Sequence, residues 1–273
     1  VSEYLGLGRP IDFDKKPVRI AMMCAVAISV VVTLWKCSTG MDSGAAVVSA
    51  LGYALSFLFS YMLALELDPD RQLAGFIGGG LTLAATYFMG EGNILVMLWL
   101  LFILRMLNRS SGDRHRLIDN VIMIGSAAWL GLQGLWVFPL LTGAAYILES
   151  QIQAGYFRSL YLADISLACL IFAKYDTVAN ELSMSNIIIM ALAFILFLPE
   201  IRVADYVKSK GDKNGKRLLP KRLQTMQGYF CMMLFSLTFL HGNAIVPSLM
   251  PAVGAAAGCG IYLFVALLKH EVF

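Results

Sequence analysis

Residues 44–65 read GAAVVSALGYALSFLFSYMLAL, and the polar segment ELDPDR follows at residues 66–71. The first segment holds 22 residues without a charge. About 20 apolar residues suffice for a helix that crosses the hydrocarbon core of a bilayer. A helix suits lipid because it satisfies its backbone N–H and C=O groups internally. The segment therefore predicts a transmembrane helix, with Pro69 ending it.

Similar apolar runs occur along the whole chain of 273 residues, of which 59% are hydrophobic and 14% charged. Soluble domains are about 45–50% apolar and about 25% charged, so the surplus requires lipid as a solvent. We expect an all-α polytopic membrane protein of about ten transmembrane helices. Residues 117–149 form either two short helices or one broken helix, which makes nine the alternative count. The predicted spans are residues 18–35, 44–65, 72–90, 92–107, 117–133, 135–149, 156–174, 184–201, 225–242 and 248–268.

The placement of Lys and Arg predicts the orientation, because these residues collect in cytoplasmic loops. With ten spans and a cytoplasmic N-terminus, nineteen of the 21 Lys and Arg residues lie inside, and only Lys36 and Lys174 lie outside. Both termini are then cytoplasmic. We expect a cytoplasmic N-terminal segment at residues 1–17, followed by a single transmembrane domain at residues 18–273 in a prokaryotic inner membrane. A basic cytoplasmic loop covers residues 202–224 of that domain.

The polar segment at the end of the second span is the first candidate site. Glu66, Asp68 and Asp70 place three carboxylates within five residues, and Arg71 follows them. Hard cations such as Mg²⁺ take carboxylate oxygens, and Arg71 could contact a phosphate. The alternative is a capped polar turn with no ligand.

The basic loop is the second candidate site. Clustered cations beside a membrane attract anionic lipid headgroups, at about 1 kcal/mol per charge near the surface. Recognition of a phosphorylated substrate is the alternative. Nucleic acid is not an expected partner, because the patch is short and has little aromatic interleaving. The predicted contacts are Lys208, Lys210, Lys213, Lys216 and Arg217.

Residues 211–220, GDKNGKRLLP, resemble the second conserved loop of UbiA-type intramembrane prenyltransferases. The resemblance implies that two Asp-rich cytoplasmic loops hold a prenyl diphosphate through Mg²⁺. Asp205 and Asp212 would join Glu66, Asp68 and Asp70 in that role. The family's first motif has an Asn-Asp pair with further Asp at four-residue spacing, whereas the acids at 66–70 are two apart and lack the Asn.

Asp164 lies within a predicted span, about 9 Å beyond Arg158 along a helix. An intramembrane carboxylate indicates a functional site by default, here for transport of a small molecule or lipid or for catalysis, and the alternative is a structural ion pair or a hydrogen-bonded neutral acid. The ten short-looped spans also look like drug/metabolite-type transporters. An accessory or scaffold subunit that contacts other membrane subunits is a third hypothesis. The His and Cys residues show no metal or haem spacing, so a cofactor is expected only under the prenyltransferase hypothesis, as Mg²⁺.

Two local expectations concern structure. Asp119 begins the fifth predicted span, where a carboxylate suits the helix N-terminus and predicts a cap. Gly75 with Gly79, and Gly254 with Gly258, have the four-residue spacing that lets helix backbones approach in lipid. That spacing predicts close packing within one bundle, contacts between subunits or a flexible gate.

Overall fold

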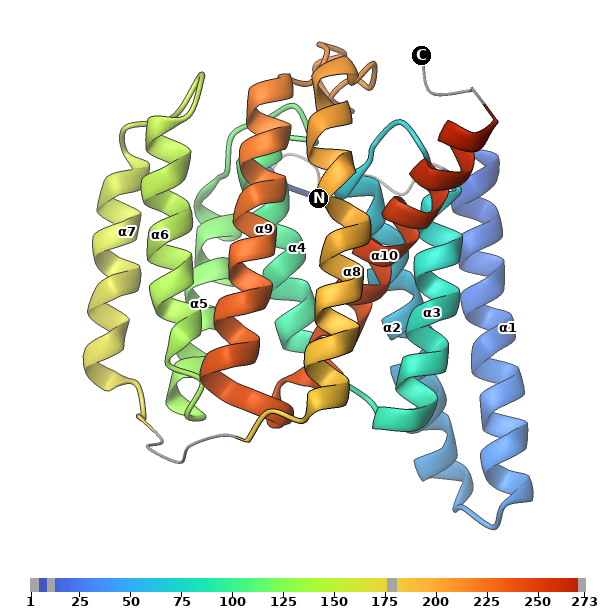
Figure 1. Ribbon diagram of the computed structural model, residues 1–273. Helices are drawn as coiled ribbons and strands as arrows, with labels where there is room; N and C mark the ends of the chain where they lie inside the picture. Colours follow the sequence, from blue (N-terminus) through green and yellow to red (C-terminus); the bar gives the residue numbers. More distant parts are fainter. Residues whose placement is uncertain (1–4, 9–12, 176–180, 270–273) are drawn as a thin grey trace. The chain divides into compact units, whose positions relative to one another are not determined.

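The computed structural model describes residues 5–8, 13–175 and 181–269, and within these ranges it is all-helical (Figure 1). Three short 3-10 helices, η1 (Cys169–Phe172), η2 (Ala204–Tyr206) and η3 (Gly242–Ala244), accompany ten α-helices in the described chain. The α-helices are α1 (Lys16–Ser38), α2 (Ser43–Leu67), α3 (Ala74–Met89), α4 (Ile94–Asn108), α5 (Leu117–Leu132), α6 (Val137–Gln151), α7 (Ser159–Ala168), α8 (Met184–Val203), α9 (Pro220–His241) and α10 (Val246–Leu268).

Each predicted span coincides with a helix, which confirms the all-helical fold. For residues 117–149 the sequence allowed either two short helices or one broken helix. The structure has two helices there, α5 and α6, and Gly134 between them has a φ of +95°. Among the residues that the structure describes, four segments are long and apolar enough to cross a membrane: α1, α2, residues Met184–Tyr206 and α10. They support an integral membrane protein, whereas the count of ten spans and the cytoplasmic termini stay predictions.

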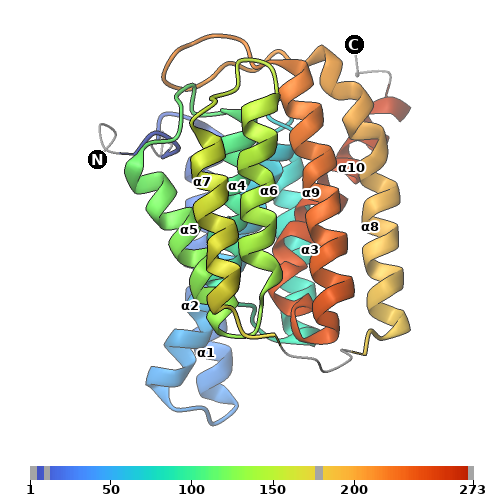
Figure 2. The same ribbon diagram turned by 90° about the vertical axis from the view of Figure 1, so that its left-hand side faces the viewer.

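The chain divides into two compact units, each built from several segments. Unit 1 comprises Val1–Pro10, Leu98–Ile187 and Ile201–Ile245, and unit 2 comprises Ile11–Met97, Ile188–Glu200 and Val246–Phe273. In unit 2, α1 packs on α2, and α10 packs on both α2 and α3 (Figure 1). In unit 1, α5, α6 and α7 pack on one another, and α9 packs on α6 (Figure 2).

Small residues bring backbones together in unit 2. A Cβ atom on Gly258 would lie 2.5 Å from the backbone N of Gly78 and 2.6 Å from the carbonyl O of Ala74. A Cβ on Gly254 would lie 2.7 Å from the carbonyl O of Gly78. Such distances are too short for a side chain, so glycine lets α3 and α10 meet backbone to backbone. The predicted close packing at Gly254 and Gly258 is confirmed.

Larger side chains fill the core of unit 1. Trp99 of α4 is fully buried, and its Nε1 donates a hydrogen bond of 2.8 Å to Thr142 Oγ1 of α6. Its ring meets Phe138 edge to face, with 4.7 Å between centroids. The hydrogen bond satisfies the polar end of an otherwise apolar side chain.

Candidate functional site

The polar turn after α2 is the candidate site in unit 2. Pro69 cannot continue a helix, and Asp68 closes α2 by donating its backbone N–H to the carbonyl O of Ala64 at 2.8 Å. The Asp68 side chain then accepts a hydrogen bond of 3.3 Å from the backbone N–H of Asp70. The Asp68 side chain therefore helps to hold the turn, whereas α3 begins after Leu73 without a side-chain cap.

Arg71 links this turn to α8. Its Nη1 lies 3.2 Å from Asp68 Oδ2 and 2.9 Å from Glu200 Oε1. A single nitrogen thus contacts two carboxylates, one that lies three residues before Arg71 and one that lies 129 residues after it. We call Asp68, Arg71 and Glu200 the Arg71 cluster.

The Arg71 cluster is buried and carries more acid than base. Asp68 and Glu200 are 4% and 2% exposed. Burial raises the pKa of the Asp68 carboxyl above its ordinary value, despite the opposing attraction of Arg71. With both acids ionised, the cluster would hold one uncompensated negative charge away from water, which is costly. Binding of a proton or another cation would neutralise it.

The other residues of the predicted acidic site lie differently. Glu66 is fully buried at the end of α2, whereas Asp70 is exposed. Arg71, expected to contact phosphate, is instead paired with the two buried acids. Within residues 5–8, 13–175 and 181–269, no group of three or more His, Cys, Asp or Glu side chains is arranged to hold a metal ion.

Glu200 was not among the predicted site residues. It stands at the inner end of the predicted span 184–201, where a charge is readily taken as the start of a loop. The available signal was a carboxylate directly after Pro199, still inside an apolar run. That signal cannot show the partner, because Arg71 is remote in sequence.

Unit 1 holds a second buried ion cluster, the Glu149 network, which consists of Glu149, Arg109 and Arg222. Glu149 is fully buried, and its Oε1 lies 2.6 Å from Arg109 Nη2. Its Oε2 pairs with Arg222, which is 1% exposed. The Arg222 guanidinium also donates to the carbonyl oxygens of Leu107, Met106 and Gln153, at 2.9, 3.2 and 2.9 Å. Arg222 therefore satisfies carbonyl groups at the C-terminal end of α4.

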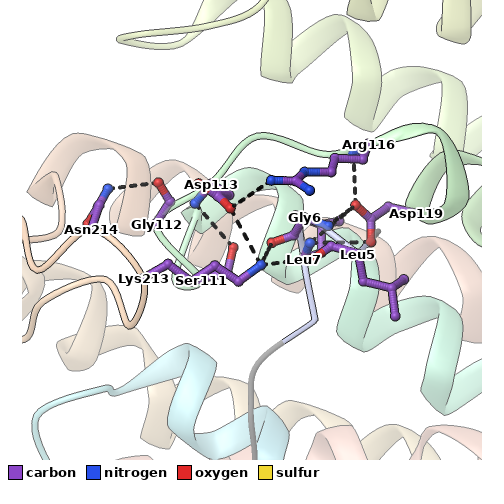
Figure 3. A network of polar contacts seen from close by, with 10 residues as sticks. All are labelled: Leu5, Gly6, Leu7, Ser111, Gly112, Asp113, Arg116, Asp119, Lys213 and Asn214. Carbon is purple, nitrogen blue, oxygen red and sulfur yellow. Dashed lines mark hydrogen bonds and ion pairs between the residues drawn. The ribbon is translucent and has the colours of Figure 1, made fainter. Parts of the chain in front are cut away.

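A network of loops adjoins the start of α5 (Figure 3). Asp119 accepts hydrogen bonds from the backbone N–H groups of Arg116 and Gly6 at 2.8 and 2.7 Å. The predicted N-terminal cap at Asp119 is confirmed, and it also holds residues 5–7. Lys213 Nζ donates to the carbonyl oxygens of Leu5 and Gly6, at 2.8 and 3.0 Å. Lys213, a predicted headgroup contact, is thus engaged within the protein.

The remaining predicted residues lie on the surface. Asp164 is exposed on α7. Asp205 is exposed and accepts a hydrogen bond of 2.8 Å from Gln224 Nε2, and Asp212 is exposed as well. Asp205 and Asp212 belong to unit 1, whereas Glu66, Asp68 and Asp70 belong to unit 2. The other basic-loop residues are all exposed: Lys208, Lys210, Lys216 and Arg217.

Comparisons of the chain with protein-family models, with curated proteins and with solved structures found no match.

Proposed function

We propose that the protein is a secondary transporter, which moves a small molecule or lipid across the membrane with a proton bound at the Arg71 cluster. The observation that carries this proposal is the position of Arg71 Nη1, within 3.2 Å of one buried carboxylate and 2.9 Å of another. Buried acids that outnumber their cation favour the uptake of a positive charge.

Protonation would also change the contact between the turn and α8. Arg71 joins the two only through charged hydrogen bonds to Asp68 and Glu200, which are stronger than neutral ones. A proton on either carboxyl weakens its bond to the guanidinium. The bound proton thus alters the link between the end of α2 and α8, which is the kind of coupling that a transporter needs.

The helices near the site contain internal prolines. Pro199 lies inside α8, directly before Glu200, and Pro251 lies inside α10. A proline lacks the N–H that would bond the carbonyl four residues earlier, so it weakens the helix at that point. Broken helices are typical of ion and substrate sites in transporters. Residues 66–71 and Pro199 therefore support the transport hypothesis better than the exposed Asp164 does.

Transport can be tested in liposomes that contain the purified protein and a trapped pH-sensitive dye. Amino acids, sugars, nucleosides and amphipathic cations would be added in turn under a pH gradient. We expect at least one class to cause proton movement in the wild type. The Glu200→Gln variant should abolish it, and Asp164→Asn should retain it.

A second measurement needs no substrate. The infrared band of a protonated carboxyl should appear on acidification of the wild-type protein and be weakened in Glu200→Gln or Asp68→Asn. Wild-type liposomes that show no solute-dependent proton movement, or a Glu200→Gln variant equal to wild type in both measurements, would rule out the proposal.

A further inference from the structure

Positive charge is concentrated in two segments of unit 1. Residues 105–116 and 205–222 together contain eleven Lys and Arg residues and three Asp residues. The whole chain contains 21 Lys and Arg against 18 Asp and Glu. More than half of the basic residues therefore lie in these two short segments, and the rest of the chain is acidic on balance.

The structure joins the two segments into one surface. The backbone N–H groups of Asp212 and Lys213 donate to the carbonyl oxygens of Ser110 and Ser111, at 3.2 and 3.0 Å. The Nδ2 of Asn214 donates to the carbonyl O of Gly112 at 2.7 Å (Figure 3). The loop between α4 and α5 is thus fixed to the loop that precedes α9.

Some of the cations in these segments face inward. Arg109 and Arg222 are paired with Glu149, and Lys213 is held by the carbonyls of Leu5 and Gly6. Others are exposed, and we call five of these the cationic rim: Arg114, Arg116, Lys210, Lys216 and Arg217. Arg116 also pairs with Asp113, 3.5 Å away and itself half-buried. The inward cations take part in fixing the loops that carry the rim.

We propose that the cationic rim binds the phosphate groups of anionic lipid headgroups in the membrane that holds the protein. The rim follows the end of α4 and precedes the starts of α5 and α9, and helix ends in a membrane protein lie near the headgroups. Arginine suits phosphate because its planar fork donates two parallel hydrogen bonds. Arg114 is also positioned over the ring of Tyr156, with 5.0 Å to the centroid.

This inference does not depend on the transport proposal. It adds Arg114 and Arg116 to the basic loop, and it requires the two loops to stay joined. A phosphate contacted from both loops would bind more tightly than one contacted from a single flexible loop, because the cations are already in place.

The test uses the full-length protein in zwitterionic nanodiscs or detergent, titrated with a short-chain phosphatidylglycerol, with binding followed by the shift of the thermal unfolding midpoint. We expect Arg116→Gln and Lys216→Gln each to lower the apparent affinity by about fivefold, from roughly 1 kcal/mol per cation near the surface. Lys174→Gln is the matched control, since Lys174 is an exposed cation of unit 1 outside the two segments, and it should bind as wild type does.

A variant that keeps every charge tests the joined arrangement. Gly112 has a φ of +87°, and a Cβ on it would lie 2.7 Å from Cγ of Asn214, so Gly112→Ala should separate the loops. Asn214→Ala removes the same contact more gently. We expect both variants to weaken binding. Equal binding by the Arg116→Gln, Lys216→Gln and Lys174→Gln variants would overturn the proposal. So would a midpoint shift of the same size with inorganic phosphate, or unchanged binding in Asn214→Ala.

Discussion

The two buried ion clusters use the same residue types in opposite proportions. The Glu149 network in unit 1 places two guanidinium groups on one carboxylate, and the Arg71 cluster in unit 2 places two carboxylates on one guanidinium. In unit 1 the second guanidinium is stabilised without a second carboxylate, because Arg222 donates hydrogen bonds to three backbone carbonyls. Carbonyl oxygens cannot serve a surplus carboxylate in the same way, since a carboxylate needs a donor or a proton.

This difference separates a structural ion cluster from one that can change state. The backbone supplies abundant acceptors at helix C-termini, so a buried arginine is easily satisfied there. A second buried acid has no such source of compensation and is neutralised most simply by a proton. The comparison therefore supports a structural role for the Glu149 network and the proposed proton binding at the Arg71 cluster.

The largest expected effect tests the structural role of the Glu149 network. Arg222→Met leaves Glu149 Oε2 without its buried guanidinium partner, with Arg109 still on Oε1, and removes the side-chain donor to the carbonyls near the end of α4. Breaking a buried ion pair in this way costs about 3–5 kcal/mol. We expect a loss of that size in the free energy of unfolding, measured by denaturant titration in detergent. Lys221→Met, at the adjacent exposed position, should stay within about 0.5 kcal/mol of wild type.

The same chemical change in both clusters gives the next largest effect. Glu149→Gln removes the anion between two arginines and should destabilise by about 2–4 kcal/mol, whereas Glu200→Gln removes surplus negative charge and should change stability by less than about 1 kcal/mol. The unfolding midpoints of the two variants provide the measurement. Equal destabilisation by Glu149→Gln and Glu200→Gln would contradict the proposed difference between the two clusters.

The smallest expected effect is an opposite response of the two units to pH. Burial raises the pKa of Asp68 in unit 2. Its contribution to stability is therefore complete below the ordinary aspartate pKa of about 3.9 and is lost as the pH rises through the raised value. Burial lowers the pKa of His115 in unit 1, against the attraction of Glu149. Its contribution is present above the ordinary histidine pKa of about 6.5 and is lost as the pH falls through the lowered value.

Acidification from neutral pH should thus stabilise unit 2 and destabilise unit 1. Each pKa unit by which a group is displaced changes the stability by about 1.4 kcal/mol. Hydrogen exchange followed by mass spectrometry, corrected for the intrinsic pH dependence of exchange, resolves the two units separately. Asp68→Asn should reduce the response of unit 2 and leave that of unit 1 unchanged. A shift of both units in the same direction would contradict the prediction.

Hydropathy was sufficient to predict the helices, because each apolar run is bounded by charged, Gly or Pro residues. The clearest departure is α9, which begins at Pro220 rather than at residue 225. Lys221 and Arg222 resemble loop residues, yet Arg222 is a buried part of the helix. Its partner Glu149 lies 73 residues away, so the local sequence does not indicate that the two residues pair.

The candidate site was predicted only where its residues are neighbours in sequence. Asp68 and Arg71 belong to one six-residue segment, and their contact spans three positions. Glu200 reaches them only through the packing of α8 within unit 2. Asp164 was the opposite case, since its place inside a predicted span suggested burial, and the structure leaves it exposed. Single-sequence patterns give the depth of a residue along a helix but not the face that packs inward.

The attachment of residues 5–7 has a consequence for the order in which the protein is assembled. Gly6 donates its backbone N–H to Asp119, which lies 113 residues later in the sequence. Leu5 accepts a hydrogen bond from Lys213, which lies 208 residues later. Translation adds about 5–20 residues per second, so the ribosome exposes residues 5–7 many seconds before Lys213 is made. Residues 5–7 therefore complete their contacts in unit 1 only long after they have been synthesised. A ribosome halted before residue 213 would hold a chain whose early residues are still unattached to that loop, which gives a chaperone or protease a defined interval in which to act.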